Sequence, residues 1–221
     1  MINGISKNEI IKLITKQLNN FFYDIEQNVV DNNIDTALLR TERCLSAMEN
    51  KYYICDKVFK FNPYHSGQYS IFLYYLANTI YRSGITSDMP DKIYYLNKIM
   101  NSVDWYYELM LPDIFGVEHP IGSVLGRAKY SNKLFIYQGV TVGGAGTGKK
   151  GYPTIGENVL LYSNTTILGA SFIGNNVIVS SGCYIKDEVI PSCSLVFGQS
   201  PNLTISQKSL DYMKEMLPLW R

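Results

Sequence analysis

The sequence is poor in histidine and cysteine, the side chains that most often hold transition metals in proteins. Its 221 residues include 2 His and 4 Cys. A zinc site built on three histidines is therefore excluded within one chain. The cysteines form no C-x-x-C pair, so buried free thiols are their expected state. They are Cys44, Cys55, Cys183 and Cys193. We expect no metal.

An excess of either charge and a long apolar run are also missing. The 20 basic and 19 acidic residues leave a net charge of +1, which removes the electrostatic case for nucleic-acid binding. The most apolar run, Tyr69 to Tyr81, is shorter than the roughly 18–20 residues that cross a bilayer. No secretory signal pattern is visible at the N-terminus. A cytoplasmic protein of one or two domains, without nucleic acid or membrane as partner, is expected.

The first hundred residues have the spacing of amphipathic helices. Apolar residues recur three and four apart from Glu9 to Phe22, which predicts one helix with a buried face. Further helices are predicted from near Asp35, from Gln68 to Arg82, and from Pro90 onward. An α-helical domain is therefore expected over residues 1–103.

The second half changes to a period of six. Two runs of anchor residues carry it: Val124, Tyr130, Ile136 and Val142, and then Ile155, Leu161, Ile167, Ile173, Val179 and Ile185. Four positions after each anchor lies a second inward candidate, the last of them Val189. A hexapeptide repeat is typical of a parallel β-helix, whereas a coiled coil needs a period near 3.5. The sequence predicts a β-helix over residues 104–205, a Gly-rich excursion loop at 143–154, and a helical tail at 206–221.

Motifs inside this repeat resemble those of the serine O-acetyltransferases. His119 begins a segment, HPIGSVLG, that is similar to the H-x-x-G-x-V-x-G element of that family, and Gln138 begins QGVTVGG, which resembles Q-x-V-T-x-G-G. Asp104 lies fifteen residues before His119, the separation that the family keeps between its catalytic Asp and His. The segment Gly198 to Pro201 resembles the terminal G-x-P segment. The resemblance covers about residues 60 to 205.

The resemblance implies an α+β protein whose N-terminal α-helical domain precedes a left-handed parallel β-helix. It implies an acetyl-CoA-dependent O-acetyltransferase, with coenzyme A entering as co-substrate and the chain assembling as a homotrimer or a dimer of trimers. His119 would be the general base, and Asp104 would orient and stabilise its ring. The helical domain would supply acceptor-side residues and oligomer contacts. The implied cofactor-binding residues are Gly144, Lys149, Lys150, Ser163 and Ser181.

Two departures from the family pattern concern the acceptor. Gly151 and Tyr152 stand where the family has Arg-His, and Asn62 stands for an acceptor-binding Asp. Without the arginine fork that grips a carboxylate, free L-serine is expected to bind weakly, unless Arg127 or a loop lysine holds it. The expected acceptor-binding residues are Asn62, His65, Glu118 and Tyr152. Three interpretations stay open: acetylation of L-serine or a relative, acetylation of a sugar or another hydroxyl, and a non-catalytic trimeric scaffold.

Overall fold

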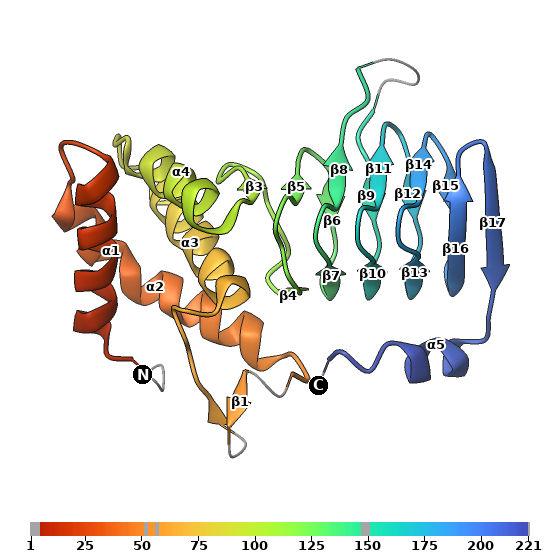
Figure 1. The fold of residues 1–221 in the computed structure, drawn as a ribbon, viewed down its shortest axis with the longest axis horizontal. Helices are drawn as coiled ribbons and strands as arrows, with labels where there is room; N and C mark the ends of the chain where they lie inside the picture. Colours follow the sequence, from red (N-terminus) through yellow and green to blue (C-terminus); the bar gives the residue numbers. More distant parts are fainter. Residues whose placement is uncertain (1–4, 51–52, 56–57, 147–150, 221) are drawn as a thin grey trace. The chain divides into compact units, whose positions relative to one another are not determined.

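The computed structural model describes residues 5–50, 53–55, 58–146 and 151–220 (Figure 1). The chain divides into two compact units, Met1–Leu109 and Met110–Arg221, so the division lies slightly after the boundary that the sequence predicts. Within the described residues, no helix combines the length and apolar character that crossing a membrane requires.

Helices make up most of the first unit. They are α1 (Lys7–Phe21), α2 (Gln27–Ser46), α3 (Ser66–Arg82) and α4 (Met89–Asn101). Short strands β1 (Ile54–Cys55) and β2 (Val58–Phe59) pair antiparallel, and β3 (Asp104–Trp105) follows α4. Helix α3 is central, because it packs against both α2 and α4 and every residue from Gly67 to Ile80 is buried. Because α3 is buried on all sides, apolar residues occur all around it, as its sequence shows.

Helix α2 begins earlier than the sequence predicts. It starts at Gln27 rather than near Asp35. Three apolar residues in its first turns, Val29, Val30 and Ile34, are buried and extend the buried face toward the N-terminus. The burial of these side chains stabilises the two extra turns.

The second unit is a parallel β-helix whose strands stack in three faces (Figure 1). One face consists of β4 (Phe115–Val117), β7 (Leu134–Ile136), β10 (Val159–Leu161), β13 (Val177–Val179) and β16 (Ser194–Gln199). A second consists of β5 (Val124–Leu125), β8 (Thr141–Gly143), β11 (Thr166–Leu168) and β14 (Tyr184–Lys186). The third consists of β6 (Lys129–Tyr130), β9 (Thr154–Ile155), β12 (Phe172–Ile173) and β15 (Val189–Ile190). Strand β17 (Asn202–Gln207) pairs antiparallel with β16, and α5 (Leu210–Met216) follows it. The predicted fold class is confirmed.

Most of the predicted anchors form the core of this β-helix. All six residues of the second run, from Ile155 to Ile185, are fully buried. They also stack on one another: Leu161 pairs in register with Val179, and Ile167 with Ile185. Aliphatic side chains on successive coils therefore fill one continuous apolar interior.

Two predicted inward residues face solvent instead. Val124 is 37% exposed and Val189 is 70% exposed, while their neighbours Leu125 and Ile190 are buried. Leu125 pairs in register with Val142, seventeen residues further along the chain. This coil has seventeen residues instead of the eighteen of three hexapeptides, so the side chain that points inward is shifted by one residue. A strict six-residue count misses this shift.

The corners of the coils depend on residues that accept a left-handed backbone. One row of corners has φ between 55° and 64° and consists of Lys133, Asn158, Asn176 and Cys193. In another row the same conformation is taken by Gly139 and Gly182. Glycine and asparagine tolerate positive φ better than other residues, which explains why both are frequent in this half of the sequence.

Candidate active site

His119 lies in the turn that joins β4 to β5. Its backbone is left-handed, with φ of 48°, and its carbonyl accepts a hydrogen bond of 2.7 Å from the Ile121 N–H. The hydroxyl of Ser123 donates to the Pro120 carbonyl over 2.7 Å. These bonds hold the turn so that the imidazole is directed to solvent, 74% exposed. An imidazole in this position is accessible to a substrate.

Glu118 is half-buried beside this imidazole. Its Oε1 lies 3.7 Å from His119 Nε2. On the next coil Tyr137 occupies the matching position, and its ring stacks on that of Tyr162 with centroids 5.2 Å apart. Burial raises the pKa of Tyr137, and the nearby Tyr162 and the Glu118 carboxylate raise it further. The Glu118 carboxylate is therefore close to both the His119 imidazole and the stacked rings of Tyr137 and Tyr162.

The strand register places His119 in one row with both predicted cofactor-binding serines. Four residues at the ends of stacked strands pair in register: Val117, Ile136, Leu161 and Val179. Two positions after these residues, just beyond the ends of the strands, lie His119, Gln138, Ser163 and Ser181. The Ser163 and Ser181 hydroxyls are hydrogen-bonded over 3.0 Å. With coils spaced about 4.8 Å apart, this polar row is roughly 14 Å long.

Sequence reasoning missed one member of the row. Gln138 was recognised as the first residue of the Q-x-V-T motif, but no role followed from the motif alone. Its neighbours are tied to the same row, since Asn164 N–H donates to the Gln138 carbonyl over 2.8 Å and Gly182 N–H donates to the Ser163 carbonyl over 2.9 Å. A count of one coil per eighteen residues, made backward from Ser181 through Ser163 and corrected for the excursion loop, is the signal that would have found it.

Tyr152 ties the end of the excursion loop to Arg127. Arg127 Nη1 donates to Tyr152 Oη over 2.9 Å, and the guanidinium lies 5.1 Å from the centre of the Tyr152 ring. The other end of the loop is close as well, because a Cβ added at Gly144 would lie 2.9 Å from Tyr152 Cε1. Tyr152, a predicted acceptor-binding residue, and Gly144, a predicted cofactor-binding residue, are thus neighbours. The Arg127 guanidinium, from the segment after β5, lies beside them.

Gly151 has no room for a side chain. A Cβ added there would lie 2.9 Å from the Cβ of Ala170 on the next coil. The position where the family carries arginine is therefore filled by a neighbour in this chain. The two predicted loop lysines, Lys149 and Lys150, lie outside the described residues.

Asp104 is held by side chains of α4 in the helical unit. Lys98 Nζ forms an ion pair of 2.9 Å with Asp104 Oδ2, and the Tyr94 hydroxyl donates to Oδ1. Burial raises the pKa of Asp104, but the hydrogen bonds from Tyr94 and Lys98 outweigh it, so the pKa lies below its ordinary value. The carboxyl is therefore ionised at neutral pH. Its predicted pairing with His119 stays a prediction.

Asn62 and His65 have local structural roles before α3. The side-chain oxygen of Asn62 accepts from the Tyr64 N–H over 2.9 Å, which forms an Asx turn. His65 is the N-cap of α3, where its Nδ1 accepts from the Gln68 N–H over 3.4 Å, and its ring packs edge-on against Tyr53. The predicted contact of Asn62 and His65 with an acceptor stays a prediction.

Groups of three or more His, Cys, Asp or Glu side chains that could hold a metal ion are absent from the described part of the chain. Three of its cysteines are free thiols: Cys44, Cys183 and Cys193.

Known proteins share both the sequence pattern and the fold. A serine acetyltransferase of Synechococcus elongatus is 31% identical over 111 residues, which is 49% of this chain and 45% of the relative. One of Bacillus subtilis is 26% identical over 143 residues, 61% of this chain and 62% of the relative. The chain thus spans less than two thirds of the length of these curated relatives. No protein family model matches it.

Solved structures extend the likeness to most of the chain. The crystal structure of serine acetyltransferase from Neisseria gonorrhoeae matches with a TM-score of 0.74 at 20% identity, over 94% of this chain and 82% of that protein. The chain resembles the serine acetyltransferases. The serine acetyltransferase of Brucella abortus in complex with coenzyme A matches with a TM-score of 0.68 at 19% identity, over 91% of this chain and 82% of that one. At these identities the solved serine acetyltransferases establish the fold, and the resemblance predicted from the sequence motifs is confirmed.

Proposed function

We propose that the chain is an acetyl-CoA-dependent O-acetyltransferase of the serine acetyltransferase type. The observation that carries this proposal is the polar row that begins at the exposed imidazole of His119 and continues to Ser181. An extended thioester that lies along the row, with Gly144 and Ser163 beside it, would bring its carbonyl to the imidazole. The relatives of that name and the coenzyme A complex of one of them support the same substrate.

In the proposed reaction His119 takes the proton from the acceptor hydroxyl. The hydroxyl oxygen attacks the thioester carbonyl, the new C–O bond forms, and the C–S bond breaks to release the thiolate, which takes up a proton. A hydroxyl is a weak nucleophile at neutral pH, so a positioned base is the main requirement. Asp104, ionised by its contacts with Lys98 and Tyr94, is the carboxylate that we assign to stabilise the imidazolium.

The acceptor is either a hydroxy amino acid or a hydroxyl compound without a carboxylate. Arg127 beside Tyr152 favours the first, because a guanidinium at the loop can bind a carboxylate with two parallel hydrogen bonds. The neutral pair Gly151 and Tyr152 favours the second, for example a sugar, because the loop itself contributes no cation at these positions.

Release of free thiol from acetyl-CoA tests the proposed function. The purified chain is expected to release thiol at a rate that depends on the acceptor when L-serine, ethanolamine and a set of sugars are offered at millimolar concentration. Acceptor-independent hydrolysis, measured without any of them, is the background to subtract. Thiol release that never rises above this background would support the scaffold interpretation instead.

We also propose that the chain assembles as a homotrimer, alone or as a dimer of trimers. Phe172 and Val189 pair in register on the third face of the β-helix, where they are 47% and 70% exposed in the single chain. Adjacent outward apolar side chains on a flat sheet face are typical of a surface that another subunit covers.

The assembly is tested by Phe172→Asp. Light scattering on the unaltered protein is expected to give at least three times the 25.1 kDa of one chain, and Phe172→Asp is expected to lower the mass because a buried, unpaired carboxylate opposes association. Phe197→Asp is the matched control, since Phe197 is similarly exposed, at 44%, on β16 of another face. A stable monomer at micromolar concentration for the unaltered chain would contradict the proposal.

A further inference from the structure

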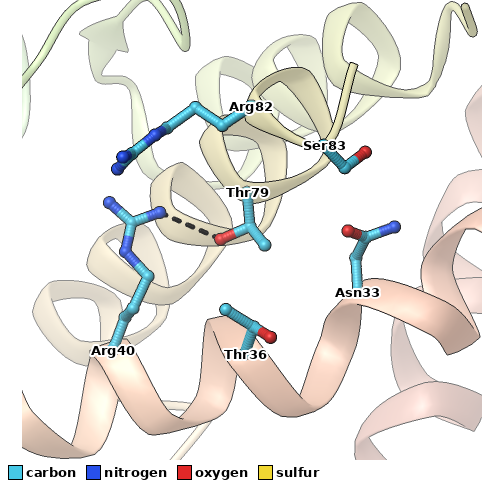
Figure 2. A pocket seen from close by; sticks show the side chains of 6 residues that line it. All are labelled: Asn33, Thr36, Arg40, Thr79, Arg82 and Ser83. Carbon is cyan, nitrogen blue, oxygen red and sulfur yellow. Dashed lines mark hydrogen bonds between the residues drawn. The ribbon is translucent and has the colours of Figure 1, made fainter. Parts of the chain in front are cut away.

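A cavity lies wholly within the helical unit, between α2 and the C-terminal part of α3 (Figure 2). Its volume is about 400 Å³. Three lining residues come from each helix: Asn33, Thr36 and Arg40 from α2, and Thr79, Arg82 and Ser83 from the end of α3. Spacings of three and four residues place each set on one helix face. Because α2 and α3 pack together, the two faces border the same space.

The chemistry of the lining is cationic and rich in hydrogen-bond donors. The six lining residues include two guanidinium groups, three hydroxyls and one amide, and none of them is a carboxylate. In Figure 2 the side chains of Arg40 and Arg82 extend from the two helices toward the same end of the cavity. An anion bound at that end of the cavity would be attracted by both guanidinium groups.

Arg40 is fixed before any ligand arrives. Its guanidinium lies 4.4 Å from the centre of the Tyr75 ring, and its Nη1 donates to Thr79 Oγ1 over 2.9 Å. Burial raises the pKa of Tyr75 well above its ordinary value, so the guanidinium lies over a neutral phenol. A preorganised guanidinium loses less conformational entropy when it binds a ligand.

Arg82 completes the cationic end of the cavity. It lies in the last turn of α3 and is exposed, and it forms no ion pair with any residue of the described ranges. The carbonyls of that turn are already satisfied, because Ser83 N–H donates to the Thr79 and Ile80 carbonyls. The Arg82 guanidinium is thus available to a ligand.

We propose that this cavity binds a small phosphoanion, with a phosphomonoester as the ligand class that fits it best. The guanidinium forks match the oxygen geometry of a phosphoryl group, and Thr36 and Ser83 add hydroxyl donors. A volume of about 400 Å³ falls within the range of small-molecule sites and exceeds what a bare phosphate fills, which leaves space for an organic part. The site is separate in its residues from the proposed acetyl-transfer site.

Isothermal titration at constant ionic strength tests this site, with inorganic phosphate and glycerol 3-phosphate as probes and chloride as the reference anion. One saturable site per chain is expected. Arg82→Gln is expected to weaken binding by tenfold or more through the loss of one charge-assisted pair. Arg40→Lys is expected to weaken it similarly, because it keeps the charge and loses the fork. Arg43→Gln is the matched control: it removes the same charge from an exposed position on α2 outside the cavity and is expected to change nothing.

The two probes distinguish the sources of the phosphoryl group. Tighter binding of glycerol 3-phosphate indicates a phosphomonoester site, and equal binding indicates a site for phosphate itself. Two results would overturn the proposal: no saturation beyond the chloride reference, or an Arg43→Gln variant weakened as much as Arg82→Gln. Unchanged thermal unfolding of each variant shows that it is folded. Thiol release from acetyl-CoA is measured separately, so failure of this site and failure of the acetyltransferase proposal give different results.

Discussion

Replacing His119 with asparagine is expected to lower kcat/KM for acetyl transfer by about 10²–10⁴-fold, or ~3–5 kcal/mol of transition-state stabilisation. The physical reason is the loss of the group that accepts the hydroxyl proton. Asparagine is the informative substitute because His119 has a φ of 48°, and asparagine accepts this left-handed backbone with little strain. The rate of acceptor-dependent thiol release measures the effect.

The stability of His119→Asn is expected to match that of the unaltered chain. The His119 side chain is 74% exposed, so its removal leaves no cavity, and the turn keeps the Ser123 hydrogen bond that closes it. His119→Ala serves as the comparison, since it removes the same imidazole but adds backbone strain of order 1 kcal/mol. A His119→Asn variant that transfers acetyl groups at the full rate would show that another group is the base, with Glu118 the first to test.

The sequence predicted the architecture well because two periodic signals carry it. The three-and-four spacing of apolar residues in the first half and the six-residue spacing in the second each report which side chains are buried, and burial dominates the energetics of folding. The errors fell where a period breaks. Val124 and Val189 lie beside coils one residue short, and the start of α2 at Gln27 precedes the first strongly apolar stretch that the helical interpretation used.

The sequence motifs named three of the four residues of the polar row, but not how these residues are connected. Motif similarity named His119, Ser163 and Ser181, but only the strand register shows that they occupy one row with Gln138. A hydrogen bond between residues 25 apart in the chain, such as that of Arg127 with Tyr152, depends on how the excursion loop returns to the coil. Local sequence carries no signal for such a contact.

The contact of Arg127 with Tyr152 changes the expectation for the acceptor. The loop sequence alone, with Gly151 and Tyr152, predicts weak binding of free L-serine. The structure brings a guanidinium to the same place from the segment after β5, within 2.9 Å of the Tyr152 hydroxyl. If the acceptor carries a carboxylate, this guanidinium is the group of the described residues best placed at the loop to hold it.

Arg127→Gln is therefore expected to raise KM for L-serine by about ten- to a hundredfold, the effect of losing a charge-assisted pair of ~1.5–3 kcal/mol, with a smaller change in kcat. Ethanolamine is the matched acceptor, since it has the amine and the hydroxyl of serine without the carboxylate, and its KM is expected to stay the same. Introducing the family's arginine directly, by Gly151→Arg, is a poorer test because its Cβ would meet Ala170; adding Ala170→Gly makes the room. If Arg127→Gln lowers activity with L-serine and with ethanolamine in equal proportion, Arg127 does not bind a carboxylate, and a sugar or another uncharged hydroxyl compound becomes the favoured acceptor.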